Sequence, residues 1–184
     1  EAIEAASTKP FGFMKFLPGP GVGGHCLPVD PSYLSWQVRR KLGQNFRFVE
    51  LANDVNDHMP DYVVQRLMAL LNDDGRALRG SRIALVGLAY KRNSSDIRES
   101  PALRLIQLLR EYGAEVIGVD PHVDEHRWPT GVERASLDLE LLSRLDAAVL
   151  VTDHDEIDLD LLGAGGIPVL DTRNRLSGER VERL

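Results

Sequence analysis

The sequence lacks the features that mark membrane, disulfide-rich and nucleic-acid-binding proteins. Its longest apolar run, residues 83–90, is far too short to cross a bilayer. It holds one cysteine, so no internal disulfide can form, and no signal peptide is recognisable. These absences favour a reducing, cytoplasmic compartment. The formal net charge of −6 provides no long-range attraction to nucleic acid or to an anionic membrane.

The composition is that of a chain that folds around a core. Of its 184 residues, 43% are hydrophobic and 27% are charged, which is ordinary for a globular protein. The chain opens without methionine on residues that read as the interior of a helix, so we expect a piece of a longer protein. An anionic ligand would need a local cluster of bases. Such clusters occur at Lys91, Arg92 and Arg98, and at Arg173 and Arg175.

The first 78 residues are predicted to be mainly helical. Helices are expected at residues 1–6, 31–42 and 48–71, with a glycine- and proline-rich loop at 9–24. Pro60 should kink or restart the third helix, with Asn56 or Asp57 capping its second half. The apolar stripe along this helix indicates a core face or a subunit interface. We expect residues 1–78 to be the remnant of a helical central or dimerisation domain.

From residue 79 onward, strand and helix patterns alternate. Strands are expected at residues 82–88, 115–119, 132–133, 147–152 and 167–170, with helices at 101–112 and 137–142. Ser100 and the proline that follows it are typical of a helix start. This alternation predicts an α/β fold in which residues 79–184 form a Rossmann-like domain with a parallel sheet.

A glycine-rich loop leads directly to the single cysteine. Glycines stand at positions 19, 21, 23 and 24. Without side chains, such a loop lets backbone N–H groups approach a ligand, often a phosphate. Cys26 follows shortly before a predicted helix, whose N-terminus favours the reactive thiolate, and Asp30 lies close to the same helix start. The alternative interpretation is a glycine-rich turn beside a small buried cysteine.

Three segments carry a resemblance to a known family. The pattern G-x-G-x-G-G-x-C-x-x-x-D at residues 19–30 resembles the active-site signature of the UDP-glucose/GDP-mannose dehydrogenase family. Its surroundings are similar to the bacterial UDP-N-acetyl-hexosamine 6-dehydrogenase branch of that family. Residues 87–100 resemble the family's UDP-binding domain, and residues 171–174 occur near the end as in relatives.

The resemblance implies a reaction at C6 of a UDP-sugar. The family oxidises the C6 alcohol to a carboxylate with two NAD⁺ in succession. Cys26 would attack the aldehyde-level carbon as thiolate, and loss of hydride would give a thioester that water hydrolyses. Asp30 would act as the base for water or orient it. The main NAD-binding domain is expected outside this chain, so we do not expect the chain alone to turn over.

The resemblance also assigns binding residues and a partner. The residues implied to contact the UDP-sugar are Phe16, Leu17, Gly19, Gly21, Gly23, Gly24, Lys91, Arg92 and Arg173. Arg98 would reach toward the cofactor phosphates. The alternative for each base is a solvated surface position. A homodimer through the 48–71 helix is expected, because the corresponding helix supports dimerisation in relatives.

The second half is a poor match to a dinucleotide-binding fingerprint. Only Gly87 stands where G-x-G-x-x-G would be, and Leu88 and Tyr90 would obstruct a pyrophosphate. Asp120 could mimic the ribose-binding acid, although the preferred interpretation is an ordinary acidic residue at a strand end.

The histidines do not form a recognisable site. His25 flanks the cysteine, but neighbours in a loop usually point apart, which argues against a catalytic role. His122, His126 and His154 lack metal-ligand spacing, so no metal site is expected, and residues 153–155 are read as a polar loop. Two alternatives to a dehydrogenase fragment stay open: a non-catalytic UDP-sugar-binding module, and an assembly piece held by the 48–71 helix.

Overall fold

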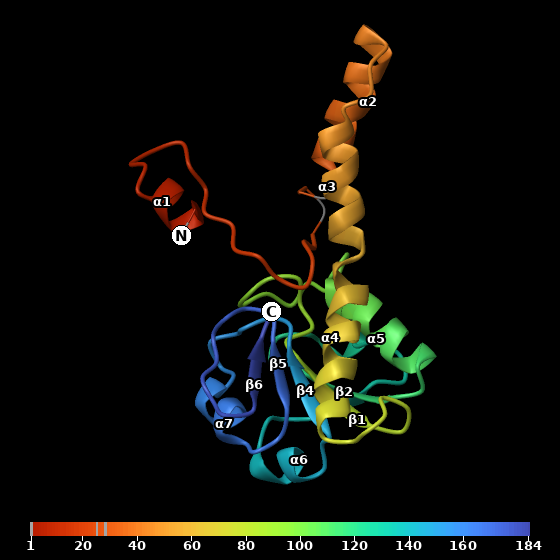
Figure 1. The fold of residues 1–184 in the computed structure, drawn as a ribbon, viewed down its shortest axis with the longest axis vertical. Coiled ribbons are helices and arrows are strands. Elements are labelled where there is room, and N and C mark those ends of the chain that lie inside the picture. The colour runs from red at the N-terminus through yellow and green to blue at the C-terminus, as the bar shows by residue number, and fades with distance from the viewer. Residues whose placement is uncertain (1, 25, 28) are drawn as a thin grey trace.

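A computed structural model describes residues 2–24, 26, 27 and 29–184. His25 and Pro28, both in the signature segment, therefore lie outside the described residues. The centre of the fold is a parallel sheet with strand order β3-β2-β1-β4-β5-β6 (Figure 1). The strands are β1 (Arg82–Val86), β2 (Glu115–Val119), β3 (Glu133–Arg134), β4 (Ala147–Leu150), β5 (Val169–Asp171) and β6 (Val181–Arg183). This order is that of a doubly wound nucleotide-binding fold and confirms the predicted fold class.

Side chains of successive strand residues enter two separate cores. In β1, Ile83 and Leu85 join the core on one face, whereas Ala84 and Val86 join the core on the other. All four side chains are fully buried. A strand covered on both faces must be apolar at every position, which explains the continuous apolar run in the sequence.

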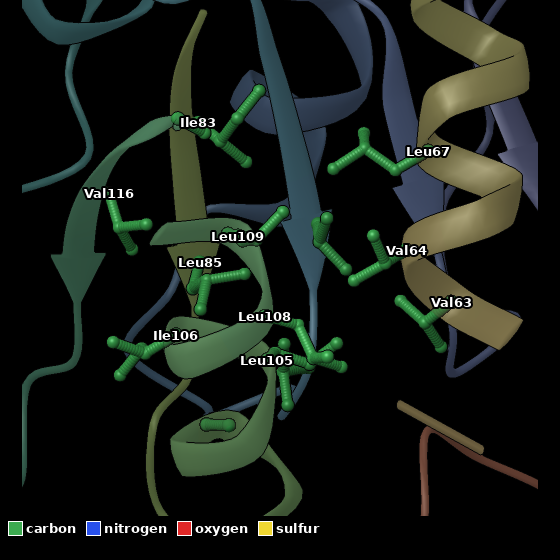
Figure 2. Close-up of a cluster of buried hydrophobic side chains, with 14 of the residues drawn as sticks. Val63, Val64, Leu67, Ile83, Leu85, Leu105, Ile106, Leu108, Leu109 and Val116 are labelled. Atoms are coloured by element: carbon green, nitrogen blue, oxygen red, sulfur yellow. The ribbon is translucent and has the colours of Figure 1, made fainter. Parts of the chain in front are cut away.

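Helices cover both faces of the sheet. The first face carries α4 (Met59–Asp73) and α5 (Pro101–Glu111), and the second carries α6 (Leu139–Ser143) and α7 (Leu159–Ala164). Figure 2 shows Val64 and Leu67 of α4 and Leu105 and Leu109 of α5 directed into the core of the first face. Residues 59–73 therefore share a core with the sheet, although they precede the predicted boundary near residue 78, which stays a prediction.

The remaining helices project from this body. In Figure 1, α2 (Asp30–Leu42) and α3 (Arg47–Asp57) extend above the sheet, and α1 (Ala2–Ser7) lies apart beyond a long loop. Large apolar side chains on α2 and α3 are exposed, with Phe48 at 75% and Trp36 at 51%. Among the described residues, no helix is both long and apolar enough to cross a membrane.

The break in the long helix differs from its prediction. The expected cap at Asn56 or Asp57 is wrong: α3 ends at Asp57 and α4 begins at Met59, with His58 between them and no side-chain cap. Asn56 is engaged elsewhere, because its Oδ1 accepts a hydrogen bond of 2.7 Å from the Val22 N–H. The pattern also missed the 3₁₀ turn η1 (Glu125–Arg127), α7 and β6. All three are short, so they carry too few residues for a periodic signal.

Candidate functional site

The order of the strands reverses between β1 and β4: β2 and β3 follow on one side, and β5 and β6 on the other. Ligands of open α/β sheets bind outside the carboxyl ends of the strands at such a point. Gly87 follows β1 with a φ of +81°, and a Cβ there would come within 2.0 Å of the Thr152 carbonyl oxygen. The Thr152 hydroxyl also donates a 2.7 Å hydrogen bond to the Ala89 carbonyl. Gly87 thus serves close packing of two loops, and the turn has no room there for a pyrophosphate.

Asp120, at the end of β2, fits neither of its two sequence interpretations. It is 4% exposed, so it is not an ordinary surface acid. Its Oδ2 accepts from the backbone N–H groups of Leu88 (2.6 Å) and Ala89 (3.0 Å). Its Oδ1 accepts from the N–H groups of His122 (2.8 Å) and Val123 (2.9 Å). Both oxygens are occupied by the protein, which leaves this carboxylate unsuited to bind a ribose hydroxyl.

His154, in the loop that residues 153–155 form after β4, completes this buried group. Its side chain is fully buried, with Nε2 lying 3.0 Å from Asp120 Oδ2. Burial by itself raises the pKa of the Asp120 carboxyl, but hydrogen bonds from His154, Ala89 and His122 outweigh it and hold that pKa far below its usual range. The two residues are 34 positions apart, and no sequence pattern connects them.

The glycine loop lies directly against the sheet domain. A Cβ on Gly23 would come within 2.6 Å of the Glu99 carbonyl oxygen and 2.7 Å of Tyr90 Cβ. Gly24, with a φ of +84°, lies against the Tyr90 ring, and Gly19 lies against the Arg173 guanidinium. Absent side chains therefore let the loop backbone touch its neighbours. The glycines thus serve packing between the loop and the sheet domain, and their predicted approach to a ligand stays a prediction.

A pocket of about 490 Å³ opens between this loop and the sheet edge. It gathers most of the predicted substrate-binding residues. Those that line it are Phe16, Leu17, Gly19, Gly21, Gly23, Lys91 and Arg173. Tyr90, Asn56 and Met59, which no sequence argument had selected for binding, line it as well. One wall is thus cationic and the other consists of backbone and apolar side chains, a combination that suits a phosphorylated ligand.

Arg173 is held firmly at this pocket. Its Nε donates a 2.6 Å hydrogen bond to the Val151 carbonyl, and its backbone N–H donates to Asp171 Oδ1 at 2.8 Å. Burial lowers the pKa of its guanidinium, an effect that Asp153 and Asp171 partly offset. Arginine nevertheless keeps its proton in proteins, so Arg173 presents a partly desolvated positive charge.

Three of the predicted binding residues do not join the pocket lining. Gly24 is close by through Tyr90, but Arg92 and Arg98 pair with carboxylates instead. Arg92 forms a hydrogen bond to Asp155, and this bond raises the pKa of the Arg92 guanidinium. Arg98 bonds to Asp96 at 2.7 Å, and this hydrogen bond raises the pKa of Arg98. A ligand would have to displace these acids to reach either arginine.

Cys26 and Asp30 lie at the start of α2. Cys26 is exposed, and its carbonyl accepts a 2.8 Å hydrogen bond from the Asp30 N–H, which begins the helix. Leu27, the next residue, lines the pocket. The cysteine thus precedes α2 and is the chain neighbour of a residue that lines the pocket. Among the described residues, no group of three or more His, Cys, Asp or Glu is arranged to hold a metal ion.

Comparison with known proteins links both halves of the chain to one family. Residues 84–178 match the model described as the UDP-glucose/GDP-mannose dehydrogenase family, UDP binding domain. Residues 1–58 match the central domain of the same family. The match over residues 84–178 alone covers more than half of the chain, and it contains Lys91 and Arg173.

Individual relatives agree with the family models. A UDP-N-acetyl-D-mannosamine dehydrogenase of Methanococcus maripaludis is 41% identical over 138 residues, covering 75% of this chain and 30% of the relative. An NDP-N-acetyl-D-galactosaminuronic acid dehydrogenase of Ralstonia nicotianae is 36% identical, covering 89% and 37%. The solved UDP-D-ManNAc dehydrogenase of Pyrococcus horikoshii aligns with a TM-score of 0.75 at 29% identity, covering 99% and 43%. The chain therefore spans about a third of the length of these sequence relatives.

Proposed function

Because this chain belongs to the UDP-glucose/GDP-mannose dehydrogenase family, we propose that it is part of an NAD-dependent nucleotide-sugar 6-dehydrogenase. The substrate proposed is a UDP-N-acetyl-hexosamine, which the names of the relatives favour. The observation that carries the proposal is the pocket in which the glycine loop faces Lys91 and Arg173. The proposed enzyme acts in the cytoplasm and in polysaccharide biosynthesis.

Recognition of the substrate would depend on charge and backbone. Lys91 and Arg173 would bind the diphosphate, since both line the pocket and arginine suits planar phosphate contacts. Phe16 and Leu17 supply the apolar wall. Gly19, Gly21 and Gly23 let the ligand lie close to the loop backbone, with Gly24 holding that loop on Tyr90. Arg92 would join only after leaving Asp155.

Cys26 would hold the carbon that is oxidised. Its thiolate adds to the C6 aldehyde to form a thiohemiacetal. Loss of hydride from this adduct to NAD⁺, bound mainly outside this chain, would give a thioester, and addition of water to the thioester would release the carboxylate and return the thiolate. Asp30, at the same helix start, would take the proton from that water or orient it.

The described sheet domain does not fit NAD as its main binding site. Leu88 and Ala89 are buried where a dinucleotide loop needs exposed glycine backbone, and the Asp120 carboxylate is already occupied. We propose that NAD, which accepts the hydride in this family, binds mainly to a part of the enzyme outside this chain. Arg98 would contact the phosphates of NAD after its ion pair with Asp96 is broken.

The proposed homodimer would form through α2 and α3. The predicted 48–71 stripe has two different environments in this chain. Phe48, Leu51 and Val55 are exposed, whereas Val63 and Leu67 are buried against the sheet. We therefore propose that the exposed apolar side chains of α3 meet the second copy.

Titration calorimetry of this chain with UDP and with UDP-GlcNAc tests the binding proposal. We expect heat of binding with both, and a loss of about tenfold or more in affinity for Lys91→Ala and for Arg173→Ala, because each removes a charged hydrogen bond to phosphate. Lys41→Ala, at the exposed end of α2, is the matched control and should bind as the unaltered chain does. Absence of heat with both ligands would contradict the proposed recognition.

The second candidate function is a non-catalytic UDP-sugar-binding or dimerisation module. The observation that favours it is the poor fit of the described residues to NAD. The two candidates differ in the intact protein: a dehydrogenase reduces NAD⁺ in the presence of a UDP-N-acetyl-hexosamine, and a binding module does not.

A further inference from the structure

We propose that Asp120 and His154 are positioning residues that hold Lys91 at the pocket by fixing both ends of the turn that carries it. The proposal rests on the proposed function, because it gives the buried pair a role in UDP-sugar binding. Neither residue lines the glycine-loop pocket. Their effect on a ligand would therefore pass through the turn at residues 88–93.

The first end of the turn is fixed by Asp120. Its Oδ2 accepts the Leu88 and Ala89 N–H groups at 2.6 and 3.0 Å, just before Tyr90 and Lys91. Because Oδ1 is bound to the backbone of residues 122 and 123, the carboxylate itself is anchored to the end of β2. A carboxylate that accepts several backbone N–H bonds is held rigidly and stays ionised.

The second end of the turn is fixed by His154. Its Nδ1 accepts a 3.0 Å hydrogen bond from the Asn93 N–H, and its Nε2 faces Asp120 Oδ2 at 3.0 Å. Because the Asn93 N–H must donate, the ring proton lies on Nε2 and is donated to Asp120. The imidazole thus links the two ends of the turn, with Lys91 midway between them.

The turn needs such support because its own backbone is strained. Asn93 has a φ of +55°, a left-handed conformation that costs free energy for a residue other than glycine. The Asn93 side chain bonds to Asp155, whose N–H donates back to Asn93 Oδ1 at 3.1 Å. Within the part of the chain that the structure describes, no hydrogen bond or ion pair holds the Lys91 ammonium, whose Nζ lies 5.6 Å from the centre of the Tyr90 ring. The position of its charge therefore depends on the backbone on either side.

Two conservative substitutions separate the links that His154 makes. His154→Asn keeps an acceptor near the place of Nδ1 for the Asn93 N–H, and His154→Gln keeps a donor near the place of Nε2 for Asp120. If the pair positions Lys91, His154→Asn should bind UDP within about threefold of the unaltered chain and His154→Gln should bind about tenfold more weakly. If His154 only stabilised the fold, the order should be the reverse. His154→Asn, which loses the hydrogen bond to the buried Asp120 carboxylate, would then be the more damaging substitution.

Amide hydrogen exchange supplies a readout that does not require UDP to bind. In His154→Gln, exchange at the Asn93 amide should speed up by about tenfold, while the amides of β5 keep their rates. His126→Asn is the matched control: this histidine is exposed on η1, outside both the turn and the buried pair, so both measurements should stay unchanged. Thermal unfolding of each variant identifies any that fail to fold.

The outcomes distinguish this proposal from the proposed function. Failure of the unaltered chain to bind UDP would contradict the proposed function, while exchange at Asn93 would still test the turn. Normal UDP binding and unchanged Asn93 exchange in His154→Gln would overturn the positioning role. Equal losses in His154→Asn and His154→Gln would overturn it as well.

Discussion

At the scale of single residues, the proposed nucleophile Cys26 is the first to test. In the intact enzyme, Cys26→Ala and Cys26→Ser should abolish formation of the uronic acid, because neither side chain combines thiolate nucleophilicity with a good leaving group. The measurement is NAD⁺ reduction together with detection of the acid product. UDP titration of the same variants should be nearly unchanged, since Cys26 is not among the residues that line the pocket. Turnover at the original rate by Cys26→Ala would contradict the mechanism.

Asp120 makes stability depend on pH in a definite direction. Because its pKa is lower in the folded chain than in the unfolded one, its stabilising contribution is complete above about pH 5 and is lost as pH falls below about 4. The free energy of unfolding in urea, measured from pH 7 to pH 3, should therefore fall toward acid.

A substitution isolates the contribution of this carboxylate. Asp120→Asn should cost about 2–4 kcal/mol at pH 7, because its amide N–H₂ would face donors, and the acid-dependent loss should become shallower. Asp124→Asn, at an exposed neighbouring position, should change stability by less than about 0.5 kcal/mol. Equal pH dependence in Asp120→Asn and the unaltered chain would contradict the assignment.

At the scale of elements, the contact between the glycine loop and the Tyr90 turn fixes the position of one wall of the pocket. Gly23→Ala should lower UDP affinity about tenfold or more, because its Cβ would collide with backbone at Glu99 and displace the loop. The sheet core does not include Gly23, so the thermal midpoint should change little. Gly75→Ala is the opposite control: its φ of +67° costs about 1 kcal/mol, but no neighbour lies within 4 Å and UDP binding should persist.

How far the sequence predicts these elements depends on the range of the interactions. Continuous apolar runs and the Ser100 cap identified the long strands and α5 correctly, since these signals are local. The end of α3 was misplaced because Asn56 bonds to Val22, 34 residues away, instead of capping α4. The pocket-lining glycines, Lys91 and Arg173 were selected by their resemblance to a family. The Asp120–His154 pair was missed because no local pattern records a contact between two strand ends.

At the scale of the whole molecule, the projecting helices α2 and α3 carry an exposed apolar surface. Leu51→Glu on α3 should convert a dimer into a monomer, since a charge cannot be buried cheaply at an apolar interface. Sedimentation velocity across a range of concentrations would measure this change. Leu139→Glu, on α6 and 73% exposed, should leave the dimer intact. A strictly monomeric unaltered chain would contradict association through α2 and α3.

The saturated carboxylate of Asp120 limits how this sheet domain can be redesigned. Rewriting residues 87–92 as a glycine-rich fingerprint would remove the bulk of Leu88 and Tyr90, but it would not release an acid for a ribose. Breaking the hydrogen bonds that Asp120 accepts from Leu88 and Ala89 would also release the turn that carries Lys91. The Asp120 carboxylate cannot both bind a ribose hydroxyl and hold the turn at residues 88–93. A dinucleotide site designed here would therefore need other residues to hold that turn.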